Sequence, residues 1–191
     1  MILDRLCSIQ MGYTTRGSHQ PDEQGSVVVQ LRDAPIAGPL RRGVLARLQL
    51  QGVDERYEVT EGDIIFRSRG EYPAAFYLGC EWQEPVIAVY PFMILRADRS
   101  KIIPEYLVWS INQVPARRYF ERESQGTTIM AINKRSLANL EIPVPSLETQ
   151  TKIVELAMLQ EREVDLLRKL ADTKSKMTTA LLIEKAKKPS L

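Results

Sequence analysis

Polar and basic side chains gather in four loop-like stretches of this sequence. These stretches are rich in arginine, lysine, serine, threonine, asparagine and glutamine, the side chains that reach phosphate groups and the edges of nucleic-acid bases. Loops of many proteins are rich in the same residues, so the composition suggests this contact without establishing it. The candidate contact residues are Arg16, Arg41, Arg42, Arg67, Ser68, Arg69, Tyr72, Gln125, Thr127, Thr128, Asn133, Lys134 and Arg135.

Arg67 and Arg69 close the predicted strand that starts at Asp63. Alternation along a strand would send their side chains to opposite faces, so at most one of the two would reach a DNA groove. A turn at Ser68–Gly70 would instead bring both to the surface. Both arrangements stay open at this point.

The sequence lacks a set of residues for catalysis. The single histidine, His19, lies in a polar loop-like stretch, which is typical of a solvated side chain rather than a general base. No glycine-rich phosphate loop, Gly-x-Ser-x-Gly turn or cysteine–histidine pair is present. Glu58 and Asp63 could serve a metal-dependent nuclease, but two nearby acids among 24 are expected by chance. We therefore predict no catalytic residue, no metal and no cofactor.

Cysteine usage and the N-terminal residues indicate a cytoplasmic protein. Cys7 and Cys80 lie far apart, which is typical of reduced, inert core thiols, whereas a zinc site needs about four ligands at close spacing. The sequence MILDRLCSIQMGY has an early acid and no basic-then-apolar signal pattern. No apolar run approaches the roughly 20 residues that span a bilayer.

Arginine and lysine are distributed unevenly along the chain. Up to Thr149 there are 15 arginines and two lysines, and after Thr149 there are seven lysines and two arginines. Arginine's rigid fork of donors matches phosphate and guanine, whereas lysine supplies a point charge that keeps a surface solvated. The first part therefore favours nucleic-acid contact, with ordinary ion pairs to its 18 acids as the alternative.

Short β-branched and aromatic runs, bounded by glycine, proline and aspartate, predict strands in the first half of the chain. The expected strands cover residues 27–31, 56–60, 63–70, 74–79 and 86–97. Proline suits the first turn of a helix, so Pro104 and Pro115 predict two short helices. We expect an α+β fold: a curled, mostly antiparallel β-sheet with short helices, followed by one long C-terminal α-helix.

The chain contains neither glycine nor proline from Glu148 to Lys188, which predicts one helix of roughly 60 Å. Gln160, Glu163 and Lys174 interrupt its apolar seam, as register-fixing polar residues do in paired helices, although a solitary marginal helix would look the same. We expect residues 1–147 to form one domain and 148–188 a dimerisation helix. The seam consists of Ile153, Leu156, Leu167, Leu170, Met177 and Leu181.

The sequence GTTIMAINKRSLANLEIPVPSLETQTKI, preceded by IIPEYLVWSIN and ARRYFERESQ, resembles the specificity subunit of type I restriction-modification systems. The resemblance is strongest from about Asp63 onward and looser before it. It covers the end of a target recognition domain and the start of the conserved helix. By this resemblance, Gly126 and Thr127 lie in a turn and Leu137 and Leu140 pack a helical turn. An extended brace then leads to the helix, which begins near Gln150 and Ile153; the brace consists of Ile142, Pro143, Pro145 and Leu147.

The resemblance implies a non-catalytic subunit that binds double-stranded DNA. Such a subunit directs an adenine-methylating modification subunit, and through it a restriction subunit, to a two-part target, with no membrane involved. The usual member holds two recognition domains and two conserved helices, whereas this chain has one of each. We therefore expect a half subunit that forms a homodimer through its C-terminal helix. A different half subunit as partner, or a protein-interaction or decoy module without DNA specificity, is the alternative.

Overall fold

The chain divides into two compact units, Met1–Thr151 and Lys152–Leu191. The computed structural model describes residues 1–14, 21–34, 40, 45–50, 52–70, 72–77, 84–124 and 130–187. Within this described part, no helix has the length and apolar character needed to cross a membrane.

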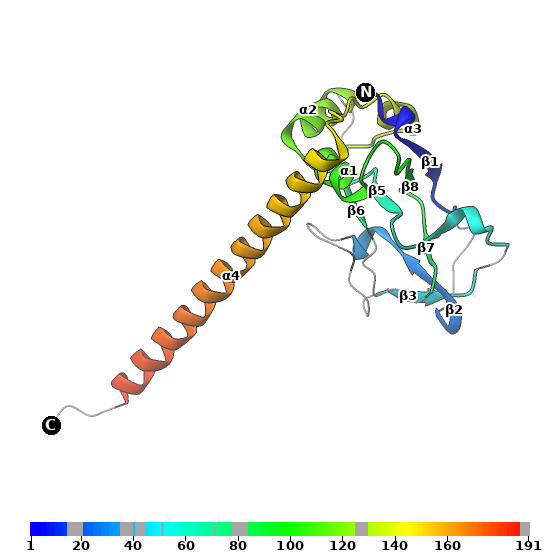
Figure 1. Ribbon diagram of the computed structural model, residues 1–191. Coiled ribbons are helices and arrows are strands. Elements are labelled where there is room, and N and C mark those ends of the chain that lie inside the picture. The colour runs from blue at the N-terminus through cyan, green and yellow to red at the C-terminus, as the bar shows by residue number, and fades with distance from the viewer. Residues whose placement is uncertain are drawn as a thin grey trace. The chain divides into compact units, whose positions relative to one another are not determined.

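The first unit contains two four-stranded sheets (Figure 1). The first sheet has the order β1-β8-β5-β6, and every neighbouring pair is antiparallel. Its strands are β1 (Cys7–Met11), β8 (Phe92–Ala97), β5 (Ile64–Arg67) and β6 (Ala74–Tyr77).

The second sheet has the order β3-β2-β7-β4. Strands β2 and β7 are parallel, and the other pairs are antiparallel. The strands are β3 (Ala46–Leu48), β2 (Pro21–Val29), β7 (Val86–Ala88) and β4 (Glu58–Val59).

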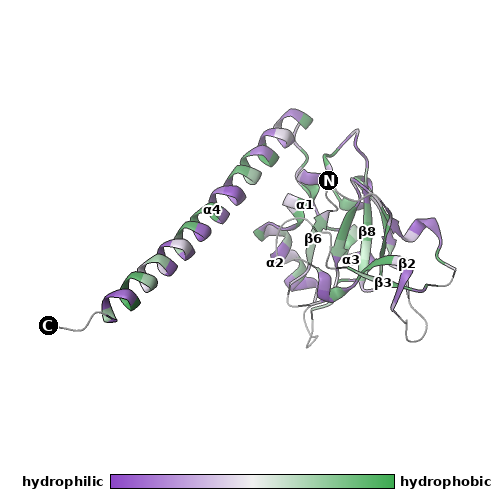
Figure 2. Cartoon of the chain, turned by 90° about the horizontal axis from the view of Figure 1, so that it is seen from below, coloured by the Kyte–Doolittle hydropathy of each residue, from purple (hydrophilic) through white to green (hydrophobic). Residues whose placement is uncertain are grey.

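The central strands of the first sheet are buried on both faces, which explains their continuous apolar sequences. Ile65 and Ile94 pack in one core cluster with Val27 and Val86 of the second sheet. On the other face, the ring of Phe66 lies 5.4 Å from that of Phe120 in helix α2 (Val114–Glu123). In Figures 1 and 2, helices α1 and α2 lie on the opposite side of the first sheet from β2 and β3.

The helices begin where local sequence favours them. Pro104 opens α1 (Pro104–Ile111), and Pro115 lies in the first turn of α2, as expected of proline at these positions. Helix α3 (Lys134–Ala138) is short, and α4 (Leu147–Ala186) contains 40 residues. Three 3-10 turns complete the described elements: η1 (Leu3–Arg5), η2 (Leu31–Asp33) and η3 (Glu55–Tyr57).

The predicted fold class is confirmed: the protein is α+β and carries a long C-terminal helix. The expectation of one strand over Val86–Ala97 is wrong, because the chain turns at Tyr90–Pro91 and supplies β7 to one sheet and β8 to the other. The structure therefore has two sheets where the sequence predicted one. Strands β1 and β3 were not expected from the sequence.

A buried glutamine anchors the start of α4 within the first unit. The side-chain oxygen of Gln150 accepts a hydrogen bond from the backbone N–H of Ile103 at 2.9 Å. Its amide nitrogen donates to the carbonyl oxygens of Lys101, at 3.1 Å, and Pro145, at 2.9 Å. All three partners are backbone groups, so the side chain fixes the first turn of α4 against the residues that precede α1 and against the extended brace.

The extended brace is held at its other end by the N-terminal segment. The backbone N–H of Leu3 donates to the carbonyl of Leu140, and the N–H of Ile142 donates to that of Met1. The hydroxyl of Tyr106, in α1, donates to the carbonyl of Pro143 at 3.0 Å. Residues from both ends of the first unit therefore lie side by side.

Replacing Gln150 by leucine should lower the free energy of unfolding by about 3 kcal/mol, because the leucine side chain fits in size but leaves three backbone partners without their hydrogen bonds. Urea unfolding of the purified chain measures the change. Arg162→Leu, at an exposed position of the same helix outside the apolar seam, serves as the control and should change stability by less than about 0.5 kcal/mol. Equal midpoints for the two variants would contradict the anchoring role.

Candidate nucleic-acid interface

The strands of the first sheet bring several turns to one end. In the register of the sheet, Met93 pairs with Met11, and Phe92 pairs with Arg67, which itself pairs with Ala74. At one end of the sheet, β1 and β5 therefore finish where β6 and β8 begin. We call this end of the strands the loop end; it includes residues 12–14, 68–70, 72–73, 89–91 and 130–133.

Backbone hydrogen bonds join the segments of the loop end. The N–H of Tyr90 donates to the carbonyl of Tyr13 at 2.9 Å, and the N–H of Ile132 donates to the carbonyl of Ser68 at 2.9 Å. Arg69 and Ala131 form an isolated antiparallel bridge. The predicted contact stretch at Arg67–Tyr72 therefore lies beside the segment that leads into Asn133, Lys134 and Arg135.

Arg67 closes the turn that follows β5. Its guanidinium donates from Nε and Nη2 to the carbonyl oxygen of Tyr72, at 3.2 and 2.9 Å. Gly70 has a φ angle of +131°, a conformation that residues with a side chain rarely adopt. The turn therefore depends on Arg67 and Gly70, and it exposes 53% of Tyr72.

Ser68 was expected on the exposed surface of this turn, and the structure corrects that expectation. The residue is only 4% exposed. Its hydroxyl donates to the carbonyl oxygen of Pro91, which joins the turn after β5 to the turn before β8. Ser68 is thus a structural residue of the loop end.

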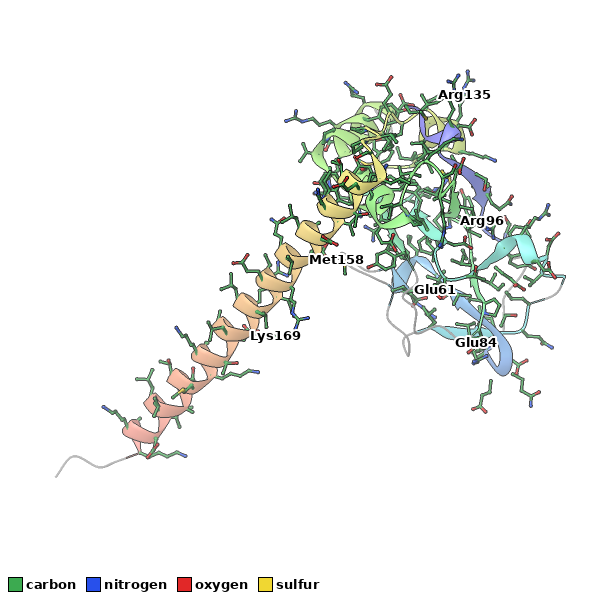
Figure 3. All side chains as sticks on the ribbon, viewed as in Figure 1. Glu61, Glu84, Arg96, Arg135, Met158 and Lys169 are labelled. Carbon is green, nitrogen blue, oxygen red and sulfur yellow. The ribbon has the colours of Figure 1, made fainter. Side chains whose placement is uncertain are left out.

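Arg69 is exposed and lies over an aromatic ring. Its guanidinium carbon is 5.5 Å from the centroid of the Tyr90 ring, and Tyr90 is itself 44% exposed. Neither Arg69 nor Arg135 forms an ion pair with an acid of the described part of the chain. Both side chains thus keep their charge available at the surface. Figure 3 shows Arg135 pointing outward.

Other arginines form ordinary surface ion pairs, which was the alternative to nucleic-acid contact in the sequence analysis. Arg47 pairs with Glu84 and Arg56 with Asp54. None of these paired arginines was a candidate contact. The arginines before Thr149 therefore include both surface ion-pair partners and an exposed residue of the loop end.

Asn133 has a structural role that the sequence also signals. Its side-chain oxygen accepts a hydrogen bond from the N–H of Ser136 at 2.8 Å and so caps the N-terminus of α3. Lys134 and Arg135 remain exposed on this short helix, while Leu137 and Leu140 are buried, as the resemblance implied.

Six of the candidate contacts lie outside the described residues: Arg16, Arg41, Arg42, Gln125, Thr127 and Thr128. His19 and Cys80 lie outside them as well. Leu40, which precedes Arg41, donates its N–H to the carbonyl of Tyr77, at the end of β6 remote from the loop end.

Of the two acids considered for a nuclease, Asp63 has a structural role through its carboxylate. The carboxylate of Asp63 accepts from the N–H of Thr60 at 3.1 Å and lies 3.4 Å from Nε of Arg96. Arg96 also donates to the carbonyl of Glu58 at 2.7 Å, so it links β8 to β4 of the second sheet. Among the residues that the structure describes, no three histidine, cysteine or acidic side chains could hold a metal ion together.

Cys7 is a buried thiol, as expected. Burial, and secondarily the charge of Asp4, raises its pKa to about 12, so the reactive thiolate is disfavoured at neutral pH. The side chain therefore offers core packing rather than nucleophilic chemistry.

Comparison with family models gives one match, over residues 4–170, to the type I restriction modification DNA specificity domain. The chain belongs to this family. Comparison with curated proteins gives no match.

Solved structures support the fold of this specificity domain. A chain from a study of complex assembly and conformational transition of the type I restriction-modification system has a TM-score of 0.65 at 23% identity, over 94% of this chain and 42% of the other. The HsdS subunit of Thermoanaerobacter tengcongensis gives 0.61 at 20% identity, over 88% and 38%. The type I S subunit of M. genitalium gives 0.56 at 14% identity, over 92% and 42%. This chain thus spans about two fifths of the length of these proteins.

Sequence reasoning missed Tyr90 among the surface residues of this specificity domain. The apolar run from Val86 to Ala97 hid the turn. A proline in the middle of a run was the available signal, since proline cannot donate to a sheet ladder and is confined to edges, first positions and bulges.

Replacing Asn133 by alanine should lower stability by about 1 kcal/mol through loss of the α3 cap. Asn133→Asp keeps a capping oxygen and should retain stability, while it removes the amide donors and adds a negative charge. Urea unfolding separates the two variants. If Asn133→Asp is as unstable as Asn133→Ala, the side chain does not act as a cap.

Proposed function

We propose that this chain recognises a specific sequence in double-stranded DNA, as a specificity component of a type I restriction-modification system, and performs no chemistry on the DNA itself. The family match over residues 4–170 carries the proposal. Residues 1–147 form the DNA-binding part. They direct an adenine methyltransferase subunit, and through it a restriction subunit, to a bipartite site in the cytoplasm.

The loop end and helix α3 support a DNA-binding surface. Arg69, Lys134 and Arg135 offer exposed cationic donors, and no acid of the described residues pairs with Arg69 or Arg135. Exposed, unpaired arginine can donate to phosphates and base edges. Tyr72 adds an exposed aromatic ring to the same turn.

The chain acts as a homodimer through α4 in this proposal. The seam residues Leu156, Leu167, Leu170, Met177 and Leu181 are each more than half exposed, and Ile153 is partly buried. A helix of 40 residues is roughly 60 Å long, and such a stripe along it favours burial against a second helix. Gln160, Glu163 and Lys174 would set the register and the choice of partner.

A twofold axis has a consequence for the DNA target. Two identical recognition units related by such an axis read inverted half-sites, so the preferred target is a palindrome interrupted by a non-specific spacer. A helix of roughly 60 Å permits half-site centres about 34–70 Å apart, or one to two turns of DNA.

Selection from duplex DNA with a randomised stretch tests DNA recognition. With the modification subunit present, the chain should enrich one interrupted motif, and its affinity should fall by orders of magnitude between low and moderate salt. No enriched motif would favour the protein-interaction or decoy alternative. Metal-dependent cleavage by the purified chain alone would instead indicate a nuclease.

Light scattering on the purified chain tests the dimer. The wild type should be a dimer at micromolar concentration, and Leu167→Lys with Leu170→Lys should give a monomer, because two charges enter the apolar seam. Met158→Lys with Ile183→Lys is the matched control, since both residues are more than half exposed but lie on the opposite face of the helix. A monomeric wild type, or a monomeric control variant, would contradict pairing through this seam.

A further inference from the structure

The ring of Tyr90 stands at the loop end, on a backbone held from two sides. Its own N–H donates to the carbonyl of Tyr13 at 2.9 Å, in the segment after β1. The carbonyl of the next residue, Pro91, accepts the hydroxyl of the buried Ser68. The aromatic side chain nonetheless remains 44% exposed. A fixed backbone with a solvent-facing ring makes Tyr90 a rigid platform at the surface.

The guanidinium of Arg69 lies on this platform. Its central carbon is 5.5 Å from the ring centroid, within the range of a cation–π contact. The bridge between Arg69 and Ala131 fixes the backbone beneath the side chain. An arginine that stacks on a ring keeps the donors along the edge of its guanidinium available to a ligand.

Arg67 lies two residues earlier and is used differently. Its Nε and Nη2 donate to the carbonyl of Tyr72, so these two nitrogens are engaged inside the protein. The two arginines of this turn therefore differ in kind. Arg67 shapes the turn, whereas Arg69 is exposed and has its guanidinium over the Tyr90 ring.

We propose that Arg69 reads a base edge and that Tyr90 is the positioning residue that holds its guanidinium for this contact. The inference rests on the proposed function, because it assigns roles within that DNA-binding surface. The two parallel hydrogen bonds that arginine forms with guanine lie in the plane of the base, so base reading requires a defined guanidinium plane. A tetrahedral phosphate, in contrast, presents its oxygens in several directions. A preset plane also lowers the entropy lost on binding.

Binding to the duplex motif that the wild type selects tests these roles. Arg69→Ala should weaken binding at least about tenfold and relax the preference at one base pair of the half-site. Tyr90→Leu should weaken binding about fivefold with the same relaxed preference, and Tyr90→Phe should remain within about twofold, because phenylalanine keeps the aromatic face. The double variant Arg69→Ala with Tyr90→Leu should bind no more weakly than Arg69→Ala alone.

Arg47→Lys is the matched control outside the loop end. It weakens the paired contacts of Arg47 with the Gly25 carbonyl and the Glu84 carboxylate, and it should lower the unfolding midpoint without changing which base is preferred. Circular dichroism and urea unfolding of every variant separate loss of folding from loss of contact.

Several results would overturn the inference while leaving the proposed function intact. They are wild-type affinity in Tyr90→Leu, equal losses in Tyr90→Phe and Tyr90→Leu, additive losses in the double variant, or a uniform loss on all sequences in Arg69→Ala. The last result would identify a phosphate contact. A wild type that enriches no motif overturns the proposed function, and the role of Tyr90 falls with it.

Discussion

Burial of β5 and β8 on both faces is the constraint on which the rest of the first unit depends. One face of these strands packs against the second sheet, and the other lies under the short helices. A slip of one residue would exchange the side chains of the two layers, placing Phe66 where Ile65 packs. The register is therefore strongly specified. Because the turns follow directly from the strand ends, the same register sets which backbone groups meet at the surface.

The polar residues of this unit divide into those that join its parts and those that face outward. Ser68, Asn133 and Gln150 have side chains suited to a ligand, yet each satisfies backbone groups of the protein itself. These hydrogen bonds hold the backbone segments that carry the exposed cationic and aromatic side chains. Whether a polar side chain near the surface binds a ligand or stabilises the fold can thus be judged only once its hydrogen-bond partners are known.

The parts predictable from sequence are those decided by local physics. Prolines mark the starts of α1 and α2, and the absence of glycine and proline marks α4. The α+β class and the family resemblance also follow from residue order. The arrangement in two sheets could not be predicted from residue order. Strands buried on both faces lack the alternation of apolar and polar residues that shows which face of a sheet is exposed. The burial of Ser68 and the contact between Arg69 and Tyr90 arise where segments distant in the sequence meet in space. The spacing of residues along the sequence does not predict such contacts.

The meeting of the N-terminal segment with the brace has a consequence for how such proteins diversify. Met1 and Leu3 pair with residues 140–142, just before α4 begins. The two ends of the first unit thus lie close together, an arrangement that tolerates transfer of a whole unit between chains. A gene segment that encodes another unit with the same two ends could replace this one by recombination, without rebuilding the helix that follows.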